Sequence, residues 1–379
     1  MQYEKISYED VPHGQGFKAW RLKILSHTEY FQLNIENQLK YLCSFGLLAP
    51  TSHNSVPQRI KLNEKNMSLD LFLDREAILP ESDPTGRQAC ISLGCAIQNI
   101  LMASKYYALK PSFNIEKLKQ HTVKPYKPDE NKYILLARIS FSKHNKTTNQ
   151  NWLKVILQRK VLRTKYDDTV KLDKDLIISL EKLVKKDFPN IHLSFIHDKL
   201  TIQKISKYQE IADRTVLENE AFTSELGKWI LPNTDSNTIG MQGKEFGFDD
   251  SFAKHIHEGL LKKTRLLPDE IAGFAASGKI MMNSSSGIAI LLVKEDTYDQ
   301  WLTAGRAYEH ISLLLLKHGI FTSIHAGMTE VDRANRMLRA LLRTNYKPVV
   351  IFRIGKPLLP KDAKRPHSAR PPLEDILLK

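Results

Sequence analysis

The stretch LAPTSHNSVPQR, residues 48–59, marks the point where a helical pattern stops and a polar loop begins. Residues 33–48 carry apolar side chains at helical spacing, and Asn34 stands near their start as a candidate N-cap. Pro50 and Pro57 bracket the loop, and the residues between them offer hydroxyl, imidazole and amide groups that both donate and accept hydrogen bonds. Such a lining suits a planar heterocycle, but the same composition is also that of an ordinary turn.

The composition is that of a folded chain. Its 379 residues, 42% of them hydrophobic, suffice for one large or two medium domains. The longest apolar runs fall well short of the roughly 18 residues that a membrane-spanning helix needs. The N-terminal residues show no basic region followed by an apolar core, so we expect a cytoplasmic protein without a membrane partner. The three cysteines sit in apolar patterns, which favours buried thiols over disulfides.

Basic residues exceed acidic ones, 56 to 42, which gives a net charge of +14. Nucleic-acid-binding proteins usually concentrate such charge on one strip, with aromatic residues interleaved where single strands stack. Here the clusters at residues 160–165, 262–265 and 333–343 are separated by mixed sequence. We therefore expect no specific nucleic-acid binding. A surface that attracts phosphorylated small molecules explains the excess equally well.

The periodicity predicts a mixed succession of helices and strands. It predicts strands at 68–73, 133–141, 288–293 and 349–354, a hairpin at 193–202, and helices at 87–109, 174–186, 207–228 and 297–318. Residues 1–32 form an N-terminal arm, and the polar stretch 142–150 is the best linker candidate. Residues 231–250 are rich in Asn, Gly and Asp, as in a lid or binding loop.

The second half of the chain repeats the first. Aligning residues 91–112 with residues 302–323 matches Gly94 with Gly305, and also Ala96 with Ala307 and Ile100 with Ile311, at an offset of 211, the difference between 305 and 94. Each helix precedes a strand with an internal arginine, Arg138 or Arg353. The chain therefore reads as two versions of one α+β unit, and a fused pair of this kind can build one site from two halves.

Four segments in order resemble the nitroreductase family. Residues 49–58, APTSHNSVPQ, are similar to its flavin-binding loop, and Arg159 and Arg163 in QRKVLR resemble the arginine pair that holds the FMN phosphate. Residues 319–328, GIFTSIHAGM, match the segment whose backbone amides meet the reactive edge of the flavin. Residues 73–101 and 363–377 look like the duplicated, Acg-like branch of that family.

The resemblance implies an α+β nitroreductase fold of two fused repeats, a pseudo-dimer with mixed and antiparallel sheets flanked by helices. The halves would be residues 33–145 and residues 151–379, with the lid at 231–250. It implies one FMN per chain and no catalytic side chain, because the flavin N5 carries the chemistry. The implied cofactor-binding residues are Pro50, Thr51, Ser52, Asn54, Arg159, Arg163 and Arg370, with the backbone N–H groups of Ala326 and Gly327 near N5.

Chemistry agrees with these assignments. Arginine forks suit a phosphate, and a cation near N1 and O2 of the ring, for which we choose Arg163, would stabilise the reduced flavin. Val161 departs from the family pattern, which often has a hydroxyl residue there. Residues 188–194, FPNIHLS, stand where a second loop would be, so one site is implied. His53 either approaches the substrate or fills the loop.

The resulting hypothesis is an oxidoreductase that transfers hydride from NAD(P)H through FMN to an organic acceptor in ping-pong order. The alternative is a flavin-sequestering or storage protein with a lid-covered FMN, and a basic nucleic-acid-binding module is a third possibility. The run HIHE at residues 255–258 lacks converging ligands, so no metal site is expected. The chain would be a monomeric pseudo-dimer or a homodimer.

Overall fold

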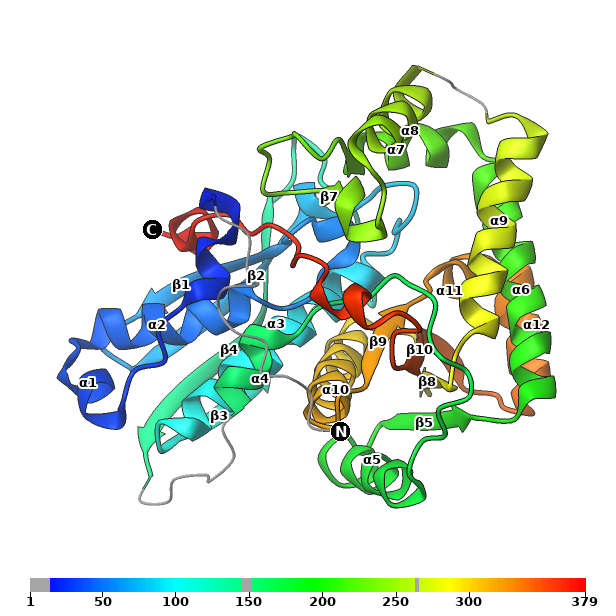
Figure 1. The fold of residues 1–379 in the computed structure, drawn as a ribbon. Helices are drawn as coiled ribbons and strands as arrows, with labels where there is room; N and C mark the ends of the chain where they lie inside the picture. The colour runs from blue at the N-terminus through cyan, green and yellow to red at the C-terminus, as the bar shows by residue number, and fades with distance from the viewer. Residues whose placement is uncertain (1–13, 145–151, 263–265) are drawn as a thin grey trace.

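The computed structural model describes residues 14–144, 152–262 and 266–379, which form an α+β structure with two main sheets (Figure 1). The N-terminal sheet has the order β11-β1-β2-β4-β3, and the C-terminal sheet has the order β5-β8-β10-β9. Within these two sheets, all neighbouring strands are antiparallel except β1 and β11, which run parallel. The strands of the N-terminal sheet are β1 (Gln58–Asn63), β2 (Ser68–Asp74), β3 (Leu109–Ile115), β4 (Tyr133–Lys143) and β11 (Leu377–Leu378). Those of the C-terminal sheet are β5 (Ile191–Ile196), β8 (Gly287–Val293), β9 (Phe321–Ile324) and β10 (Lys347–Gly355).

The two sheets share one connectivity. In each half, a helix precedes the first strand, and a long helix follows the second strand and leads to the third. The strands then lie in the order first, second, fourth, third, as β1-β2-β4-β3 and as β5-β8-β10-β9. The equivalent helices are α2 (Ile35–Leu47) with α5 (Lys174–Asp187), and α3 (Arg87–Tyr106) with α10 (Tyr298–Lys317). The sequence repeat covers only part of this order, namely the helices α3 and α10 and the later strands β4 and β10 that carry Arg138 and Arg353.

Helices α3 and α10 pack against each other in the middle of the molecule (Figure 1). A Cβ atom on Gly94 would lie 2.1 Å from the carbonyl oxygen of Leu302, and one on Gly305 would lie 2.0 Å from that of Ile91. Leu302 and Ile91 differ by the same 211 positions as the two glycines, so the contact is reciprocal. Because glycine has no Cβ, both backbones approach this closely.

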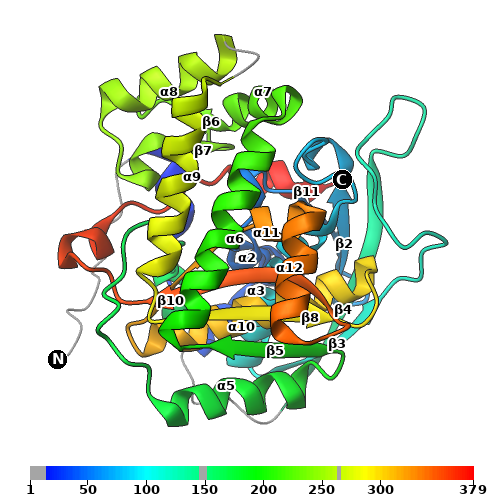
Figure 2. The same ribbon diagram turned by 90° about the vertical axis from the view of Figure 1, so that its right-hand side faces the viewer.

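The C-terminal sheet is buried on both faces. On β8, Ile288, Ile290 and Leu292 belong to one hydrophobic cluster, and the alternate residues belong to another. Covering both faces explains why this strand is a continuous apolar run. One face is covered by α6 (Lys199–Leu217), α9 (Pro268–Asn283) and α12 (Asp332–Leu342), as Figure 2 shows.

An insertion distinguishes the C-terminal half. Strands β1 and β2 are joined by a short turn, whereas α6, α7 (Glu220–Trp229), α8 (Asp250–Lys262) and α9 separate β5 from β8. Between α7 and α8, the short strands β6 (Ile230–Leu231) and β7 (Met241–Gln242) pair in parallel, and the 3-10 helix η5 (Gly243–Phe246) follows. The segment 231–250 that we expected to be a lid therefore has structure of its own.

The C-terminal segment returns to the N-terminal half. After β10 the chain passes through the 3-10 helices η6 (Pro360–Lys364) and η7 (Leu373–Ile376), drawn in red in Figure 1. It ends in β11, where Leu377 pairs with Ile60. The end of the second half thus completes the sheet of the first, while the division at residues 33–145 and 151–379 stays a prediction.

The other helices are short. They are α1 (His27–Gln32), α4 (Trp152–Gln158) and α11 (Gly327–Glu330), with 3-10 helices η2 (Gln15–Arg21), η3 (Ser52–Asn54) and η4 (Arg75–Ala77). Helix α2 begins as expected, since the side chain of Asn34 accepts a hydrogen bond from the backbone N–H of Asn37. Of the N-terminal arm, residues 1–13 lie outside the described residues, as do residues 145–150 of the expected linker.

Two expected elements are wrong. Residues 193–202 do not form a hairpin, because β5 ends at Ile196 and Asp198 caps α6 by accepting from the backbone N–H of Thr201. The single helix expected at 207–228 is two helices, since Asn219 caps α7 through the backbone N–H groups of Ala221 and Phe222. In both places a capping side chain starts a helix where the apolar pattern alone gave no boundary.

Candidate functional site

The loop after α2 is held in a strained conformation. His53, Asn54 and Val56 have φ angles of 48°, 56° and 48°, a left-handed region that is unusual for residues with a branched or bulky side chain. The Asn54 amide donates hydrogen bonds to the carbonyl oxygens of Thr238, Gly240 and Ala369 at 3.0–3.1 Å. The loop is therefore fastened to the lid segment and to the C-terminal tail. Such over-determined strain is typical of ligand sites.

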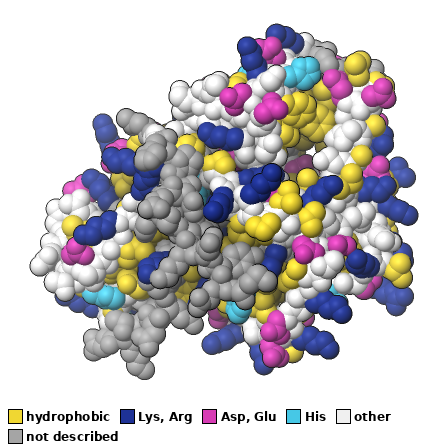
Figure 3. Space-filling model, viewed as in Figure 1, with side chains coloured by type: hydrophobic (Ala, Val, Ile, Leu, Met, Phe, Trp, Pro, Cys, Tyr) yellow, Lys and Arg dark blue, Asp and Glu magenta, His cyan; other side chains and the backbone are white. Residues whose placement is uncertain are grey.

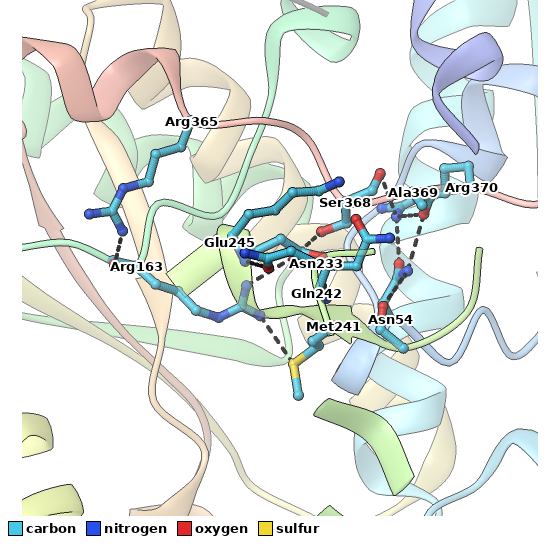
Figure 4. Close-up of polar contacts among 12 residues, drawn as sticks. Asn54, Arg163, Asn233, Met241, Gln242, Glu245, Arg365, Ser368, Ala369 and Arg370 are labelled. Carbon is cyan, nitrogen blue, oxygen red and sulfur yellow. Dashed lines mark hydrogen bonds and ion pairs between the residues drawn. The ribbon is translucent and has the colours of Figure 1, made fainter. Parts of the chain in front are cut away.

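Arg370 fastens the same loop from the other side. Its guanidinium donates to the carbonyl oxygens of Leu47 at 2.9 Å and Ala49 at 2.8 Å. It also donates to Oδ1 of Asn54 at 2.5 Å, as Figure 4 shows. These partners include a carbonyl at the C-terminal end of α2, where a cation is favourable. Burial, and after it the charge of Arg159, lowers the Arg370 pKa to about 9.

Behind the loop lies a small polar cavity of about 30 Å³, roughly the space of one water molecule in the liquid. Beside Arg370, three more cations line it, those of Arg159, Lys160 and Arg163. Arg159 is buried, donates to the carbonyl oxygen of Leu48 at 2.6 Å, and has its Nε 3.3 Å from a carboxylate oxygen of Glu309. Burial, opposed by the Arg159 charge, raises the Glu309 pKa to about 7.

His367 also lines the small polar cavity. Its ring is buried against Trp20, with 4.3 Å between the ring centroids. Neither ring nitrogen makes a hydrogen bond of normal length and angle among the described residues, although the backbone of Gln158 is close enough to oppose the lowering of the His367 pKa. Burial, reinforced by the neighbouring cations, lowers the His367 pKa well below its usual value, so the ring is neutral. Buried polar atoms of this kind call for a further partner.

The lid segment places a carboxylate in this cavity. Glu245 is buried, and its Oε2 accepts from Oγ of Ser368 at 2.5 Å and lies 3.4 Å from the guanidinium of Arg163. Figure 4 shows Arg163 directed toward Glu245 and Met241. The Arg163 guanidinium also lies 4.7 Å from the ring centroid of Phe246. An anion from the chain itself thus stands among the cations.

A second, much larger cavity of about 810 Å³ adjoins the small one, and Pro50, Thr51, Val161 and Arg163 line both. Its volume is in the range of small-molecule and cofactor sites. The insertion supplies an apolar wall that includes Phe222, Leu226, Phe246, Phe248, Phe252 and Phe274. Figure 3 shows hydrophobic side chains beside a hollow in this region. We call this the large apolar cavity.

The floor of the large apolar cavity is formed by β9, α11 and their connection. His325, Ala326 and Gly327 line it, and the backbone N–H of Ala326 donates to no acceptor in the described part of the chain. Nε of Arg353 donates to Nε2 of His325 at 3.1 Å, so that ring nitrogen is an acceptor. Burial, followed by the charges of Arg353 and Arg163, lowers the His325 pKa to about 3.

All nine residues expected from the sequence line one of the two cavities. Pro50, Thr51 and Arg163 line both. Ser52, Ala326 and Gly327 line only the large cavity, and Asn54, Arg159 and Arg370 line only the small one. Their role toward a ligand stays a prediction. For Asn54 and Arg370, the hydrogen bonds above are already made within the chain.

Sequence reasoning missed several titratable residues in these cavities, among them Lys160, Asp213, Glu245, Glu330 and His367. One signal was present for Asp213, because it continues the buried stripe of Ile202, Ile205, Gln209 and Ala212 along α6. An acid at an apolar position of a helix points to a buried role. Glu245 had no such signal in its polar surroundings.

Other possible sites are less developed. Among the described residues, no three His, Cys, Asp or Glu side chains converge where they could hold a metal ion. On the face seen in Figure 3, Lys and Arg are scattered among acidic residues and form no continuous strip. No helix in the described ranges has the length and apolar character needed to cross a bilayer.

Comparison with known proteins finds relatives without an assigned function. No protein-family model matches the chain. Two curated proteins of Mycobacterium tuberculosis, the uncharacterized proteins MT3212 and Rv3127, are each 24% identical over 345 residues, which cover 89% of this chain and 92% of theirs.

Several solved structures are partly similar. The FMN-dependent nitroreductase NfnB of Mycobacterium smegmatis, solved with NADPH, has 12% identity and a TM-score of 0.38, covering 59% of this chain and 95% of its own. A BluB-like flavoprotein of Clostridium difficile has 12% identity and a TM-score of 0.39, covering 61% and 99%. A nitroreductase-like family protein of Bacillus cereus has 14% identity and a TM-score of 0.34, covering 62% and 98%. With TM-scores below 0.5, these likenesses assign no function to this chain.

Proposed function

We propose that the chain binds one FMN and is an oxidoreductase of nitroreductase type. The observation that carries this proposal is the pairing of a cationic polar cavity with a large apolar cavity, joined by the strained loop that resembles a flavin-binding loop. FMN has the same two parts, a phosphate and a planar ring. When bound, FMN would accept hydride from NAD(P)H and pass it to an organic acceptor.

The residues present fit an anionic group in the small polar cavity. Arg159, Lys160 and Arg163 supply charge, and the ring nitrogens of His367 supply further hydrogen-bonding capacity. Charge-assisted hydrogen bonds to phosphate are stronger than neutral ones. The Glu245 carboxylate at the cavity wall already binds Ser368 and Arg163, so it would compete with a phosphate for these groups.

The large apolar cavity fits the ring and an uncharged acceptor. Arg163 lines both cavities, so it is the cation best placed to balance negative charge at the N1 and O2 edge of a ring. The backbone N–H of Ala326 has no acceptor among the described residues, so it is available to an acceptor atom of the flavin ring. Gly327 permits close approach of the ring to the backbone. Pro50, Thr51 and Ser52 would contact the ring from the N-terminal half.

Asn54 and Arg370 have a different role in this proposal. Their hydrogen bonds run to each other and to backbone carbonyls, so they hold the loop in its strained shape. They would therefore act on cofactor affinity through the position of Pro50 and Thr51. Replacing either residue should weaken FMN binding without removing a direct phosphate contact.

We further propose that the chain is an internal duplication that forms a pseudo-dimer. The shared strand order and the reciprocal contact of Gly94 and Gly305 support this. In the N-terminal half, the ten residues 48–57 join α2 to β1. In the C-terminal half, only the three residues 188–190 join α5 to β5, so there is no room for a second loop of this kind. One cofactor site per chain follows. A measured ratio of two bound FMN molecules per chain would contradict it.

The alternative function is flavin sequestration. It is favoured by one observation, that the segment 231–250 is hydrogen-bonded to Asn54 of the loop and brings the Glu245 carboxylate to the wall of the small cavity. The two functions separate in anaerobic mixing of the FMN-loaded protein with NADPH or NADH. Rapid bleaching of the flavin absorbance supports the oxidoreductase. Bleaching only after residues 234–239 are replaced by a shorter Gly/Ser linker supports sequestration.

The proposal itself is tested by purifying the protein and measuring bound flavin. We expect about one FMN per chain after addition of excess FMN and gel filtration. A colourless protein whose flavin cannot be restored would contradict both functions.

A further inference from the structure

Two half-buried carboxyl groups, those of Asp213 and Glu330, line the large apolar cavity near Gly327. Asp213 comes from α6, and its Oδ1 lies 3.2 Å from the position that a Cβ of Gly327 would take. Its Oδ2 lies 2.1 Å from the corresponding position on Gly278 of α9. Glu330 is the last residue of α11, three positions after Gly327. Both carboxyl groups therefore flank the segment expected to meet the reactive edge of the ring.

Neither carboxyl group has a counter-ion. Asp213 accepts a hydrogen bond from the amide of Gln209 at 2.7 Å, and Glu330 accepts one from the amide of Gln88 at 2.7 Å. No lysine or arginine in the described part of the chain forms an ion pair with either. Burying an unpaired carboxylate is costly, so these groups favour their neutral, protonated form.

Burial raises the Asp213 pKa to about 7, opposed by the Gln209 hydrogen bond. Burial also raises the Glu330 pKa to about 7; the Arg87 charge and the Gln88 hydrogen bond oppose the shift, and the Asp83 and Asp213 charges add to it. With a pKa of about 7, each of these carboxyl groups is protonated in a substantial fraction of molecules near neutral pH.

The pair is tied to the loop of the N-terminal half. The Gln88 side chain bonded to Glu330 accepts a hydrogen bond from Oγ of Ser52 at 2.7 Å. The Ser52 hydroxyl also lies 3.2 Å from Nδ1 of His53. Burial, followed by the charge of Arg163, lowers the His53 pKa to about 4, so this ring is neutral near pH 7. Among these cavity-lining groups, the two carboxyls are the ones that hold a transferable proton at neutral pH.

We propose that Asp213 and Glu330 are the proton source for acceptor reduction, with Asp213 as the group that donates. This inference rests on the proposed function. Two-electron reduction of an acceptor double bond takes up one hydride and one proton. The hydride comes from NAD(P)H by way of the bound cofactor. The O–H bond of Asp213 breaks, its proton goes to the acceptor heteroatom, and the carboxylate takes a new proton from Glu330 or solvent.

A first experiment needs no flavin. An acid whose pKa is higher in the folded than in the unfolded state makes the folded state bind more protons, so its contribution to stability is lost as pH rises toward the folded pKa. Asp213→Asn and Glu330→Gln remove this loss. Relative to wild type, each should lower the equilibrium constant for unfolding in urea at least about tenfold more at pH 8 than at pH 5. Glu181→Gln, on an exposed face of α5, is the matched control. Equal effects at both pH values would overturn the proposal.

A second experiment uses the FMN-loaded protein, reduced anaerobically and mixed with 1,4-benzoquinone or with ferricyanide. Benzoquinone takes up protons on reduction, whereas ferricyanide takes up electrons alone. Asp213→Asn should slow the reaction with benzoquinone about 100-fold and abolish its decline above pH 7, since a positioned general acid contributes roughly that much. The reaction with ferricyanide and the reduction by NADPH should keep their rates.

The outcomes are distinguishable. If the variants change the pH dependence of unfolding but not the reaction with benzoquinone, the proton-donor role is wrong and FMN binding is untouched. Equal slowing with both acceptors would show a structural effect instead and would also overturn the role. Failure of the wild-type protein to bind FMN would overturn the proposed function and this inference together.

Discussion

The small polar cavity and the large apolar cavity share one loop but have opposite chemistry. The first gathers Arg159, Lys160 and His367 around a space of about 30 Å³, with the Glu245 carboxylate at its wall. The second encloses about 810 Å³ behind aromatic side chains of the insertion and holds two acids without counter-ions. Cations fix an anion, whereas an apolar wall excludes water. Cofactor affinity and acceptor turnover should therefore respond to different mutations.

Arg159→Ala should have the largest effect, because it removes a buried cation from the wall of the small polar cavity. The change leaves the buried Glu309 carboxylate and the Leu48 carbonyl without their partner. Breaking a buried ion pair from one side should lower the free energy of unfolding by about 3 kcal/mol. Loss of a charged phosphate contact should raise the FMN dissociation constant about 100-fold. Urea denaturation and fluorescence titration measure the two effects.

Glu309→Gln is the control for that variant, since it keeps a polar partner and removes the charge. It should retain FMN. An Arg159→Ala protein that holds FMN as tightly as wild type would show that the phosphate is placed wrongly.

Glu245→Gln should increase the affinity of the small polar cavity for an anion. The wild-type carboxylate accepts from Ser368 and pairs with Arg163, so it competes with a phosphate for the same groups. Removing its charge should tighten FMN binding about tenfold. Glu258→Gln, an exposed residue of α8 that pairs with Lys262, is the matched control and should change nothing. Weaker FMN binding in Glu245→Gln would mean that the carboxylate supports the cofactor.

Phe252→Ala tests the apolar cavity alone. The side chain lines that cavity but is 46% exposed, so its loss should hardly affect folding. Removing this apolar surface should raise the KM for an uncharged aromatic acceptor several-fold, about 1 kcal/mol, and leave the FMN dissociation constant unchanged. Phe31→Ala, 41% exposed on α1, is the control. An equal loss of FMN affinity would show that the large apolar cavity also binds the cofactor, and would contradict separate roles for the two cavities.

Gly273→Ala should have the smallest effect. A Cβ there meets nothing within 4 Å, and replacing a helical glycine by alanine stabilises by about 0.5–1 kcal/mol. On the same helix, Gly278→Ala would place a Cβ 2.1 Å from Asp213 and should lower stability and disturb the acid pair. Thermal or urea unfolding of both variants gives the comparison. Equal effects would show that Asp213 moves aside freely.

Much of the fold was predictable because local signals agree with the packing. The Asn34 cap, the strand Ser68–Asp74 and the long helices α3 and α10 all follow from apolar periodicity. The repeat gave the equivalence of Gly94 and Gly305. Strands 58–63 and 109–115 were not expected. Leu109–Ile115 alternates apolar and polar residues, which is a strand signal, but the preceding helix was expected to run to residue 109. Strand 58–63 begins with Gln58, a buried polar residue, which obscures its pattern.

The site was predictable in part. The loop, the arginines and the segment at Ala326 were placed by resemblance, and the structure brings them to adjacent cavities. What sequence could not show is how each polar group is used. Arg370 has the chemistry of a phosphate ligand, yet its donors meet carbonyls of the loop. Glu245 and Glu330 gain their roles from contacts between segments more than 80 positions apart. The spacing of residues along the chain cannot predict such contacts between distant segments.

The central claim, that the two cavities together hold one FMN, is tested most directly by comparing FMN with riboflavin in equilibrium binding to the wild-type and variant proteins. We predict one FMN per chain and riboflavin binding at least about tenfold weaker, because riboflavin lacks the phosphate. Arg159→Ala should abolish that difference, and Arg163→Ala should weaken both ligands, since Arg163 lines both cavities. Equal affinity of the wild-type protein for FMN and riboflavin, or no binding of either, would contradict the account.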